Sequence, residues 1–351
     1  MRTNYKYLLL LGLLPASITP SLAKAFTAPS TASTHHIYNA EKLIERDIIV
    51  GADGFKLPGT LTLPINASES NKVPCLILVH GSGPNDRDET LGPNKPFRDL
   101  AWGLAERGIA TIRYDKRTRV YGAKCVPAGK ELNYDTEAVD DAVATIAWAD
   151  SIPEVAAEHI YVLGHSLGGS LAPRIAQRSN KLAGIIVLAG LVRPLGETLI
   201  DQVTYIASLS GEPTAEMKAQ IAMLRMQVEN AKKVGSMEFD PSIPLPMSVP
   251  ASYWMMENQY QPAETAASLN IPILILQGER DYQVTMLDYG LWQINLMGKP
   301  NATFKSYPKL NHLFQEGEGM ATPQEYTQSI PLTPYVIDDI AHFIQQKISK
   351  P

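Results

Sequence analysis

The sequence predicts an α/β fold with a mostly parallel sheet of eight strands, flanked by helices and carrying a helical cap inserted after the sixth strand. Short apolar runs rich in Ile, Val and Leu recur along the chain, and longer segments of helical period separate them. The runs are apolar throughout, which indicates strands buried on both faces. The 351 residues, 45% of them hydrophobic, suffice for one such domain with an insertion or for two small domains.

The apolar runs give the order of the strands. Residues 46–50 and 57–63 predict an antiparallel pair joined by a turn at Asp53 and Gly54. The six later strands are expected at residues 75–79, 110–114, 160–163, 185–188, 273–276 and 302–307. The main helices are expected at residues 97–107, 136–149, 167–178, 286–296 and 334–347.

Residues 190–271 interrupt this alternation, because about 80 residues pass without a convincing strand. Helical periodicity at residues 197–208, 214–233 and 247–257 predicts a cap over about 191–265. Seven of the eleven methionines fall in this interval: Met217, Met223, Met226, Met237, Met247, Met255 and Met256. Flexible methionine side chains suit an adaptable pocket roof, but in an amphipathic helix they are more often part of the core.

The first 25 residues have the pattern of an export signal. Arg2 and Lys6 precede an apolar run at residues 8–14, and Ala-Lys-Ala at residues 23–25 provides a cleavage site. We therefore expect cleavage near Ala25 and a periplasmic or secreted protein. A membrane anchor is the alternative, but the run is shorter than the ~20 residues that a spanning helix needs. Residues 26–39, rich in Ser, Thr, Ala and His, predict a flexible linker before a domain of residues 40–351.

Charge and cysteine content exclude several classes of protein. The formal charge is −5, and removal of Arg2, Lys6 and Lys24 with the signal leaves 28 basic against 36 acidic residues, or −8, which argues against a nucleic-acid partner. No Cys/His cluster has the spacing of a structural zinc site. Cys75 begins a predicted strand, whereas Cys125 follows the far end of the next strand. This separation predicts two unpaired thiols even in an oxidising compartment.

The sharpest local signal is Gly-His-Ser-Leu-Gly at residues 164–168, which follows an apolar strand and opens a helix. A nucleophile at the apex of a tight strand-to-helix turn is held in a strained conformation that only small flanking residues allow, which explains Gly164 and Gly168. The helix N-terminus beyond the turn favours developing negative charge. Ser166 is therefore the predicted nucleophile.

A serine hydroxyl needs a base and an acid that orients that base. Two histidines follow Ser166 in the sequence: His312, in a loop after the last strand, and His342, within the final helix. We expect His312 to be the base. Asp281 follows the penultimate strand directly and is the expected acid. The competing carboxylates are Glu279, Glu197 and Asp201.

Two backbone N–H groups must receive the oxyanion, and each can lower the barrier by ~3 to 4 kcal/mol. Leu167 N–H directly follows the nucleophile, and Ser82 N–H lies in the Gly-containing loop of residues 80–88. A plain Gly/Pro turn is the alternative for that loop. Charged residues beside it predict a salt-bridge network that braces the loop, rather than direct substrate contacts: Asp86, Arg87, Asp88, Arg113, Asp115, Lys116 and Arg117.

The cap and one loop supply candidates for the substrate pocket. Tyr253 and Trp254 are candidate substrate-binding residues, although two aromatic residues in a helix more often pack in the core. The long polar loop of residues 118–135 is a candidate pocket wall.

Five short motifs occur in a characteristic order. They are residues 80–88 (His-Gly-Ser-Gly-Pro-Asn-Asp-Arg-Asp), 114–117 (Tyr-Asp-Lys-Arg), 164–169 (Gly-His-Ser-Leu-Gly-Gly), 278–284 (Gly-Glu-Arg-Asp-Tyr-Gln-Val) and 311–314 (Asn-His-Leu-Phe). Together they resemble the α/β-hydrolase superfamily, and more narrowly a bacterial esterase group of serine aminopeptidase or dienelactone-hydrolase-like proteins. The resemblance extends from Arg46 to the C-terminus. It implies a capped α/β-hydrolase fold, a triad of Ser166, Asp281 and His312, and carboxylic-ester hydrolysis without a cofactor.

We therefore expect an exported, carboxylesterase-like serine hydrolase that cleaves esters of small to medium acyl groups through an acyl-enzyme. Its expected partner is a small-molecule ester, and we expect neither a metal nor a membrane anchor. A peptidase or an acyltransferase would use the same triad. A binding protein on an inactive hydrolase scaffold is the alternative that is not an enzyme.

Overall fold

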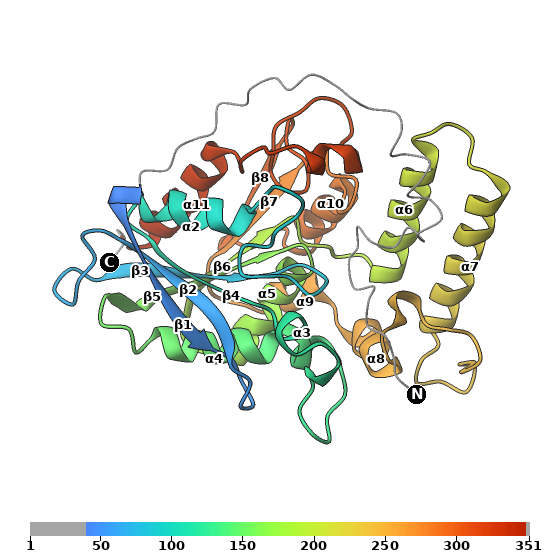
Figure 1. The fold of residues 1–351 in the computed structure, drawn as a ribbon, viewed down its shortest axis with the longest axis horizontal. Helices are drawn as coiled ribbons and strands as arrows, with labels where there is room; N and C mark the ends of the chain where they lie inside the picture. The colour runs from blue at the N-terminus through green and yellow to red at the C-terminus, as the bar shows by residue number, and fades with distance from the viewer. Residues whose placement is uncertain (1–39, 349–351) are drawn as a thin grey trace.

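The computed structural model describes residues 40–348, and its centre is an eight-stranded sheet in the order β1-β2-β4-β3-β5-β6-β7-β8 (Figure 1). The strands are β1 (Leu43–Val50), β2 (Leu57–Pro64), β3 (Val73–Val79), β4 (Ala110–Tyr114), β5 (Val155–His165), β6 (Leu182–Leu188), β7 (Ile273–Gly278) and β8 (Ala302–Tyr307). The β1–β2 and β2–β4 pairs are antiparallel, and the other pairs are parallel. The predicted mostly parallel sheet is confirmed, and the β1–β2 turn has positive φ at Asp53 and Gly54.

The register of the parallel strands aligns their carboxyl ends at one edge of the sheet. Val79 of β3 pairs with Gly164 of β5, and Gly164 pairs with Val187 of β6. Leu188 of β6 pairs in turn with Leu276 of β7. The segments that follow these strands therefore begin side by side, at the edge where sheets of this kind bind ligands.

Helices connect the strands. In chain order they are η1 (Ala40–Lys42), α2 (Pro96–Ala105), α3 (Arg117–Tyr121), η2 (Gly122–Lys124), η3 (Asp135–Val139), α4 (Asp140–Ala149), α5 (Leu167–Arg178), α6 (Leu195–Ser208), α7 (Ala215–Ala231), η4 (Pro246–Ser248), α8 (Ala251–Gln259), α9 (Pro262–Ala267), α10 (Met286–Asn295), η5 (Pro323–Thr327) and α11 (Pro334–Ile348). The predicted helices at residues 167–178, 286–296 and 334–347 are confirmed to within one residue. The predicted helix at 136–149 begins as the π-helical turn η3, and the short helices α3 and α9 were not expected from the sequence pattern.

The central strands separate two apolar layers. In β3, Leu76 and Leu78 pack on one face with side chains of α2 and α11, whereas Cys75 and Ile77 face the layer that contains α4, α5 and α10. This alternation follows from the period of two in a strand. Because helices cover both faces, the strands are apolar throughout, as the sequence indicated.

Helices α6 to α9 lie between β6 and β7, and α6, α7 and α8 stand beside the sheet on the right of Figure 1. The helix expected at residues 247–257 is present as α8, but its expected start is wrong. Met247 has a φ of 61°, and α8 begins only after Pro250. Proline lacks the N–H that an uninterrupted helix requires at this position, so it begins a helix instead.

Most methionines of the cap do not pack in the core, whereas a role of these side chains in a pocket roof stays a prediction. Met223, Met226, Met237 and Met255 are exposed, so they do not form a core between cap and sheet. Met247 is buried in the layer that contains α5.

Several further predictions concern the surface and the ends. Cys75 and Cys125 are buried and unpaired, as expected.

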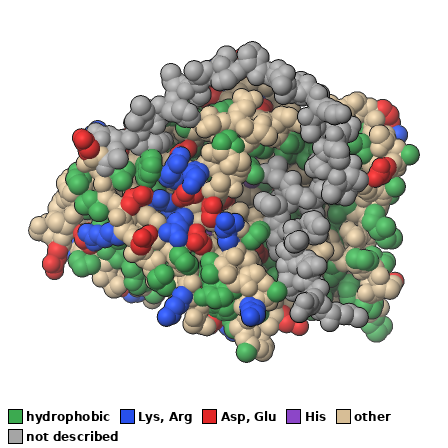
Figure 2. Space-filling model, viewed as in Figure 1, with side chains coloured by type: hydrophobic (Ala, Val, Ile, Leu, Met, Phe, Trp, Pro, Cys, Tyr) green, Lys and Arg blue, Asp and Glu red, His purple; other side chains and the backbone are tan. Residues whose placement is uncertain are grey.

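Acidic and basic side chains are interspersed on the face shown in Figure 2 and form no continuous basic patch there. Within residues 40–348, no helix is long and apolar enough to cross a membrane. The predicted signal and linker, residues 1–39, lie outside the described residues.

Candidate active site

Ser166 occupies the sharp turn between β5 and α5. Its φ of 54° and ψ of −120° are unusual for a residue with a side chain, and they direct the chain from the strand into the helix. The flanking glycines are required because the backbone on either side of Ser166 lies very close to neighbouring backbone atoms. A Cβ atom on Gly164 would lie 1.9 Å from the Gly168 carbonyl oxygen, and one on Gly168 would lie 2.2 Å from the Val79 carbonyl oxygen. The predicted strand-to-helix turn is thus present, with the backbone strain expected of a nucleophile at this position.

Asp281 and His312 form a buried pair at the same edge. Asp281 lies in the segment that follows β7, where its Oδ1 accepts hydrogen bonds from the N–H groups of Gln283 (2.7 Å) and Val284 (3.0 Å). Its Oδ2 accepts a hydrogen bond from His312 Nδ1 at 2.6 Å. Because Nδ1 carries the proton, Nε2 of the neutral imidazole retains the lone pair that a base needs.

His312 lies against the residue that precedes Ser166. The rings of His165 and His312 have centroids 4.6 Å apart, and His165 Nε2 donates to the His312 carbonyl oxygen at 3.0 Å. Within residues 40–348, the Ser166 hydroxyl makes no hydrogen bond to His312 or to another group. Catalytic hydrogen bonds of free enzymes are often long and tighten when substrate binds. The structure therefore gathers the three residues at one rim, with the Asp281–His312 contact already formed.

The competing residues predicted from the sequence have other partners. Glu279 accepts a hydrogen bond from Ser306 Oγ at 2.8 Å. Glu197 and Asp201 lie on α6, where they pair with Lys232 and Arg193. His342 is exposed on α11.

The two predicted oxyanion donors flank the nucleophile. Leu167 N–H belongs to the first residue of α5, so it has no partner within the helix. Ser82 N–H lies in the loop after β3, and a Cβ atom on the preceding Gly81 would lie only 3.0 Å from Ser166 Cβ. Neither N–H donates to an acceptor in the part of the chain that the structure describes. Both are free to receive a developing negative charge.

Salt bridges brace the loop that contains Ser82, as predicted, but Arg117 is not part of them: its guanidinium group pairs with Asp141 instead. Arg87 makes two contacts of 3.1 Å with the Asp115 carboxylate, one from Nε and one from Nη2. Asp88 accepts from Arg113 Nε and from Lys95 Nζ, each at 2.9 Å. These contacts join the loop to the segment at the end of β4.

A second buried pair, Glu89–His165, was not predicted from the sequence. Glu89 Oε2 accepts from His165 Nδ1 at 2.8 Å, and Glu89 Oε1 accepts from Gly81 N–H at 2.6 Å. Burial alone would raise the pKa of Glu89, but the charge and hydrogen bond of His165 outweigh it and lower that pKa. Burial alone would lower the pKa of His165, but Glu89 raises it above its usual value. Since both ring nitrogens of His165 face acceptors, the ring is a protonated imidazolium.

The position of His165 inside the nucleophile motif is the signal that could have indicated this pair. Its partner Glu89 lies 76 residues earlier in the chain. The pair links two parts of the site. Glu89 accepts a hydrogen bond from Gly81 N–H, and His165 donates one to the carbonyl oxygen of His312.

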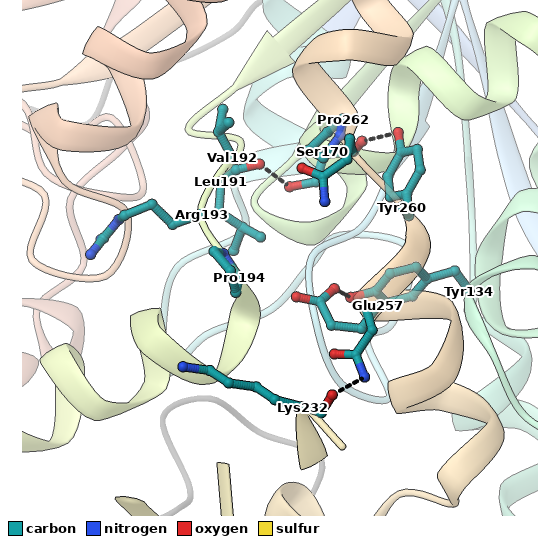
Figure 3. A pocket seen from close by; sticks show the side chains of 12 residues that line it. Tyr134, Ser170, Leu191, Val192, Arg193, Pro194, Lys232, Glu257, Tyr260 and Pro262 are labelled. Atoms are coloured by element: carbon teal, nitrogen blue, oxygen red, sulfur yellow. Dashed lines mark hydrogen bonds between the residues drawn. The ribbon is translucent and has the colours of Figure 1, made fainter. Parts of the chain in front are cut away.

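A cavity of about 170 Å³ lies between the cap and α5 (Figure 3). Ser170, one helical turn after Ser166, lines it, but Ser166 itself does not. Glu257, Pro194 and Lys232 face its open space. Tyr134 donates a short hydrogen bond to Glu257 Oε2, and Leu195 N–H donates to Oε1 at 2.5 Å. Burial raises the pKa of Glu257.

The predicted substrate residues lie behind this cavity rather than in its wall. Tyr253 and Trp254 are both buried in the layer that contains α5. The Tyr253 ring packs edge-on against Tyr134, with centroids 4.8 Å apart, and Tyr134 does line the cavity. The loop of residues 118–135 thus contributes a wall through Tyr134, whereas the role of Tyr253 and Trp254 in binding stays a prediction. Among residues 40–348 no three His, Cys, Asp or Glu side chains are grouped to hold a metal ion.

This sheet, with a serine in the turn after β5, a carboxylate after β7 and a histidine after β8, defines the protein as an α/β-hydrolase of the serine hydrolase class. Residues 94–318 match the family model described as serine aminopeptidase, S33, and the chain belongs to that family. It is 38% identical to Esterase EstD of Thermotoga maritima over 304 residues, which cover 87% of this chain and 68% of that protein. The chain is therefore a carboxylesterase-like hydrolase.

Solved structures share the fold at lower identity. Est1E from Butyrivibrio proteoclasticus, solved with ferulic acid bound, has a TM-score of 0.55 and 18% identity, covering 86% of this chain and 100% of that one. An acetyl xylan esterase from Paenibacillus sp. R4 has a TM-score of 0.54 and 16% identity, covering 88% of this chain and 86% of that one.

Proposed function

We propose that the protein is an exported esterase that hydrolyses carboxylic esters of small to medium acyl groups through an acyl-enzyme on Ser166. The observation that carries this proposal is the hydrogen bond of 2.6 Å from His312 Nδ1 to Asp281, made at the rim where Ser166 sits in its strained turn. It leaves His312 Nε2 as the acceptor for the serine proton.

The chemistry follows from these positions. Ser166 Oγ attacks the ester carbonyl carbon while its proton passes to His312 Nε2, and Asp281 stabilises the imidazolium that forms. The carbonyl oxygen becomes an oxyanion and accepts hydrogen bonds from Ser82 N–H and Leu167 N–H. When the C–O bond to the alcohol breaks, His312 gives its proton to the leaving alkoxide oxygen. Water then attacks the acyl-enzyme by the same route, releases the acid and restores the Ser166 hydroxyl.

We further propose that the substrate enters the cavity beside α5, whose lining favours an ester over a peptide with a free amino terminus. An aminopeptidase needs an unpaired carboxylate or carbonyl groups that bind an ammonium group. Glu257 is the carboxylate that faces the cavity, but both of its oxygens already accept hydrogen bonds, and burial raises its pKa. The ammonium group of a peptide N-terminus would therefore find no unpaired carboxylate oxygen of Glu257 to bind.

The acyl group is proposed to be small or medium because the described cavity beside α5 is about 170 Å³. Aromatic side chains of Tyr134 and Tyr260 line it together with Pro194 and Pro262, which suits an apolar or aromatic acyl chain. Acetyl and feruloyl esters are suitable first substrates, because two proteins of the same fold are an acetyl xylan esterase and an esterase solved with ferulic acid.

A serine-directed fluorophosphonate probe tests the mechanism. Wild type should be labelled and should hydrolyse p-nitrophenyl acetate, whereas Ser166→Ala should show neither property. Labelling that persists in Ser166→Ala would overturn the proposal. A panel of aryl esters of increasing chain length, with acetylated sugars, feruloyl esters and aminoacyl amides, then measures the substrate preference. Faster turnover of the amides would favour the peptidase.

Export is proposed from the basic start, the short apolar run and the Ala-Lys-Ala site of residues 1–25. Expression of the full chain in a bacterium, followed by N-terminal sequencing of the protein in each compartment, tests this part. The expected product begins at Phe26 outside the cytoplasm. An intact Met1 in the cytoplasm alone would contradict export and leave the esterase proposal unaffected.

A further inference from the structure

We propose that Lys116 is a positioning residue of the oxyanion hole, which orients and polarises the peptide group that donates Ser82 N–H. This role rests on the proposed esterase mechanism. Lys116 follows β4 and its side chain is almost completely buried. Its Nζ donates to the Gly81 carbonyl oxygen at 3.0 Å.

The Gly81 carbonyl and the Ser82 N–H belong to the same peptide group. In a trans peptide the C=O and N–H bonds point in opposite directions, so a group that holds the carbonyl on one side determines where the N–H points on the other. Asn85 Nδ2 is a second donor to the same oxygen, at 3.1 Å. Two donors therefore hold this carbonyl on the side away from the oxyanion.

The neighbouring peptide group is held as well. Glu89 accepts Gly81 N–H at 2.6 Å, and Gly81 lies directly beside Ser166 Cβ. Rotation of the Gly81–Ser82 peptide would break the contacts to Lys116 and Asn85. Ser82 N–H is therefore preorganised, and it needs no rearrangement when the carbonyl of a substrate becomes charged.

A positive charge at the carbonyl oxygen does more than orient the peptide. It draws electron density toward that oxygen and makes the N–H at the other end a stronger donor, an effect that is larger in a buried site of low dielectric. The ammonium group is itself paired with Glu137 at 2.6 Å, and that side chain is fully buried too. This pairing places a carboxylate directly against the buried ammonium group.

A matched set of double variants separates this role from simple stabilisation. Lys116→Met with Glu137→Leu removes the charge without leaving an unpaired partner, and such replacements of buried ion pairs are often neutral or stabilising. The control is Arg117→Met with Asp141→Leu. Arg117 and Asp141 form a fully buried pair with a contact of 2.5 Å, one residue further along the chain, and they do not touch the loop of residues 80–88.

We expect the Lys116/Glu137 variant to lose about tenfold to hundredfold in kcat with KM within threefold of wild type, because the donor is weakened rather than removed. Its affinity for a trifluoromethyl ketone, which forms a tetrahedral oxyanion on the serine, should fall by a similar factor. The Arg117/Asp141 control should keep kcat within threefold. Asn85→Ala, which removes the second donor to the Gly81 carbonyl, should lose about threefold to tenfold in kcat and gives an independent test if a double variant fails to fold.

The results that would overturn the role of Lys116 are distinct from those that would overturn the esterase. A folded Lys116/Glu137 variant with wild-type kcat and ketone affinity would exclude it. Equal losses in both double variants would also exclude it, since they would indicate a general effect of removing buried charge. Failure of wild type to react with the fluorophosphonate or to hydrolyse esters would instead contradict the proposed function.

Discussion

The carboxyl edge of the sheet and the helical cap differ in how they use polar and apolar side chains. At the edge, charged groups are buried and paired, as in Lys116–Glu137 and Glu89–His165. In the cap, large apolar side chains such as Met223 and Met226 are exposed. Buried pairs hold one arrangement because separating them is costly, whereas exposed side chains can change at little cost. The difference indicates that the edge holds one fixed arrangement of charged groups, whereas the exposed side chains of the cap can be substituted at little cost in stability.

The largest expected effect at the edge comes from Asp281→Asn. The asparagine can still fill the space, but it favours the wrong tautomer of His312, so kcat should fall by about 10⁴-fold with a normal fold. Turnover of an aryl ester and far-UV circular dichroism would measure both quantities. A loss below tenfold would show that another group orients His312.

Arg117→Met alone should be the most destabilising change at this edge. It leaves the Asp141 carboxylate buried without its main partner, which should lower the free energy of unfolding by about 3–5 kcal/mol. Urea denaturation compares this variant with Arg117→Met/Asp141→Leu, in which much of the loss should be recovered. Equal stability of the single and double variants would indicate that water reaches Asp141.

The Glu89–His165 pair should add stability in a defined pH range. The pKa of His165 is raised, so its contribution is complete below the ordinary value of 6.5 and is lost as pH rises through the raised pKa. The pKa of Glu89 is lowered, so its contribution is complete above 4.5 and is lost as pH falls through the lowered pKa.

The free energy of unfolding of wild type, minus that of Glu89→Gln/His165→Gln, should therefore be greatest between pH 4.5 and 6.5, at about 2 kcal/mol, and should decline on both sides. Denaturation at a series of pH values measures this difference. A difference that does not vary with pH would show that the pair is not ionised.

The smallest effect is expected in the cap. Met223→Gln/Met226→Gln changes two exposed side chains of α7, so the free energy of unfolding should change by less than about 0.5 kcal/mol. The value of kcat/KM for acetyl and longer aryl esters should stay within twofold of wild type. A selective loss with the longer esters would mean that α7 contacts the acyl chain, which would weaken the contrast between cap and edge.

The sequence predicted the sheet and the three residues of the candidate triad because these follow from local patterns. Apolar runs mark strands, and Ser166, Asp281 and His312 each follow one directly or within a short loop. Pro250 marks the start of α8 in the sequence as well, because proline favours the first turn of a helix over its interior. Pairs such as Lys116 with Glu137 could not be predicted, because their contact depends on how the segment after β4, at the start of α3, packs against η3. The cavity wall combines Tyr134 with the distant Glu257, and no local period joins these two residues.

Gly168 holds the start of α5, which follows Ser166, against the end of β3, which leads into the loop of Ser82. Its Cα lies so close to the end of β3 that even a methyl group would meet the Val79 and His80 carbonyl oxygens, at 2.2 and 2.6 Å. A larger residue there would push the helix behind the serine away from the strand that leads into the loop of Ser82. The Ser166 hydroxyl and the Ser82 N–H are thereby kept at a fixed distance from each other. A position that tolerates no side chain thus fixes the geometry in which the proposed oxyanion would form.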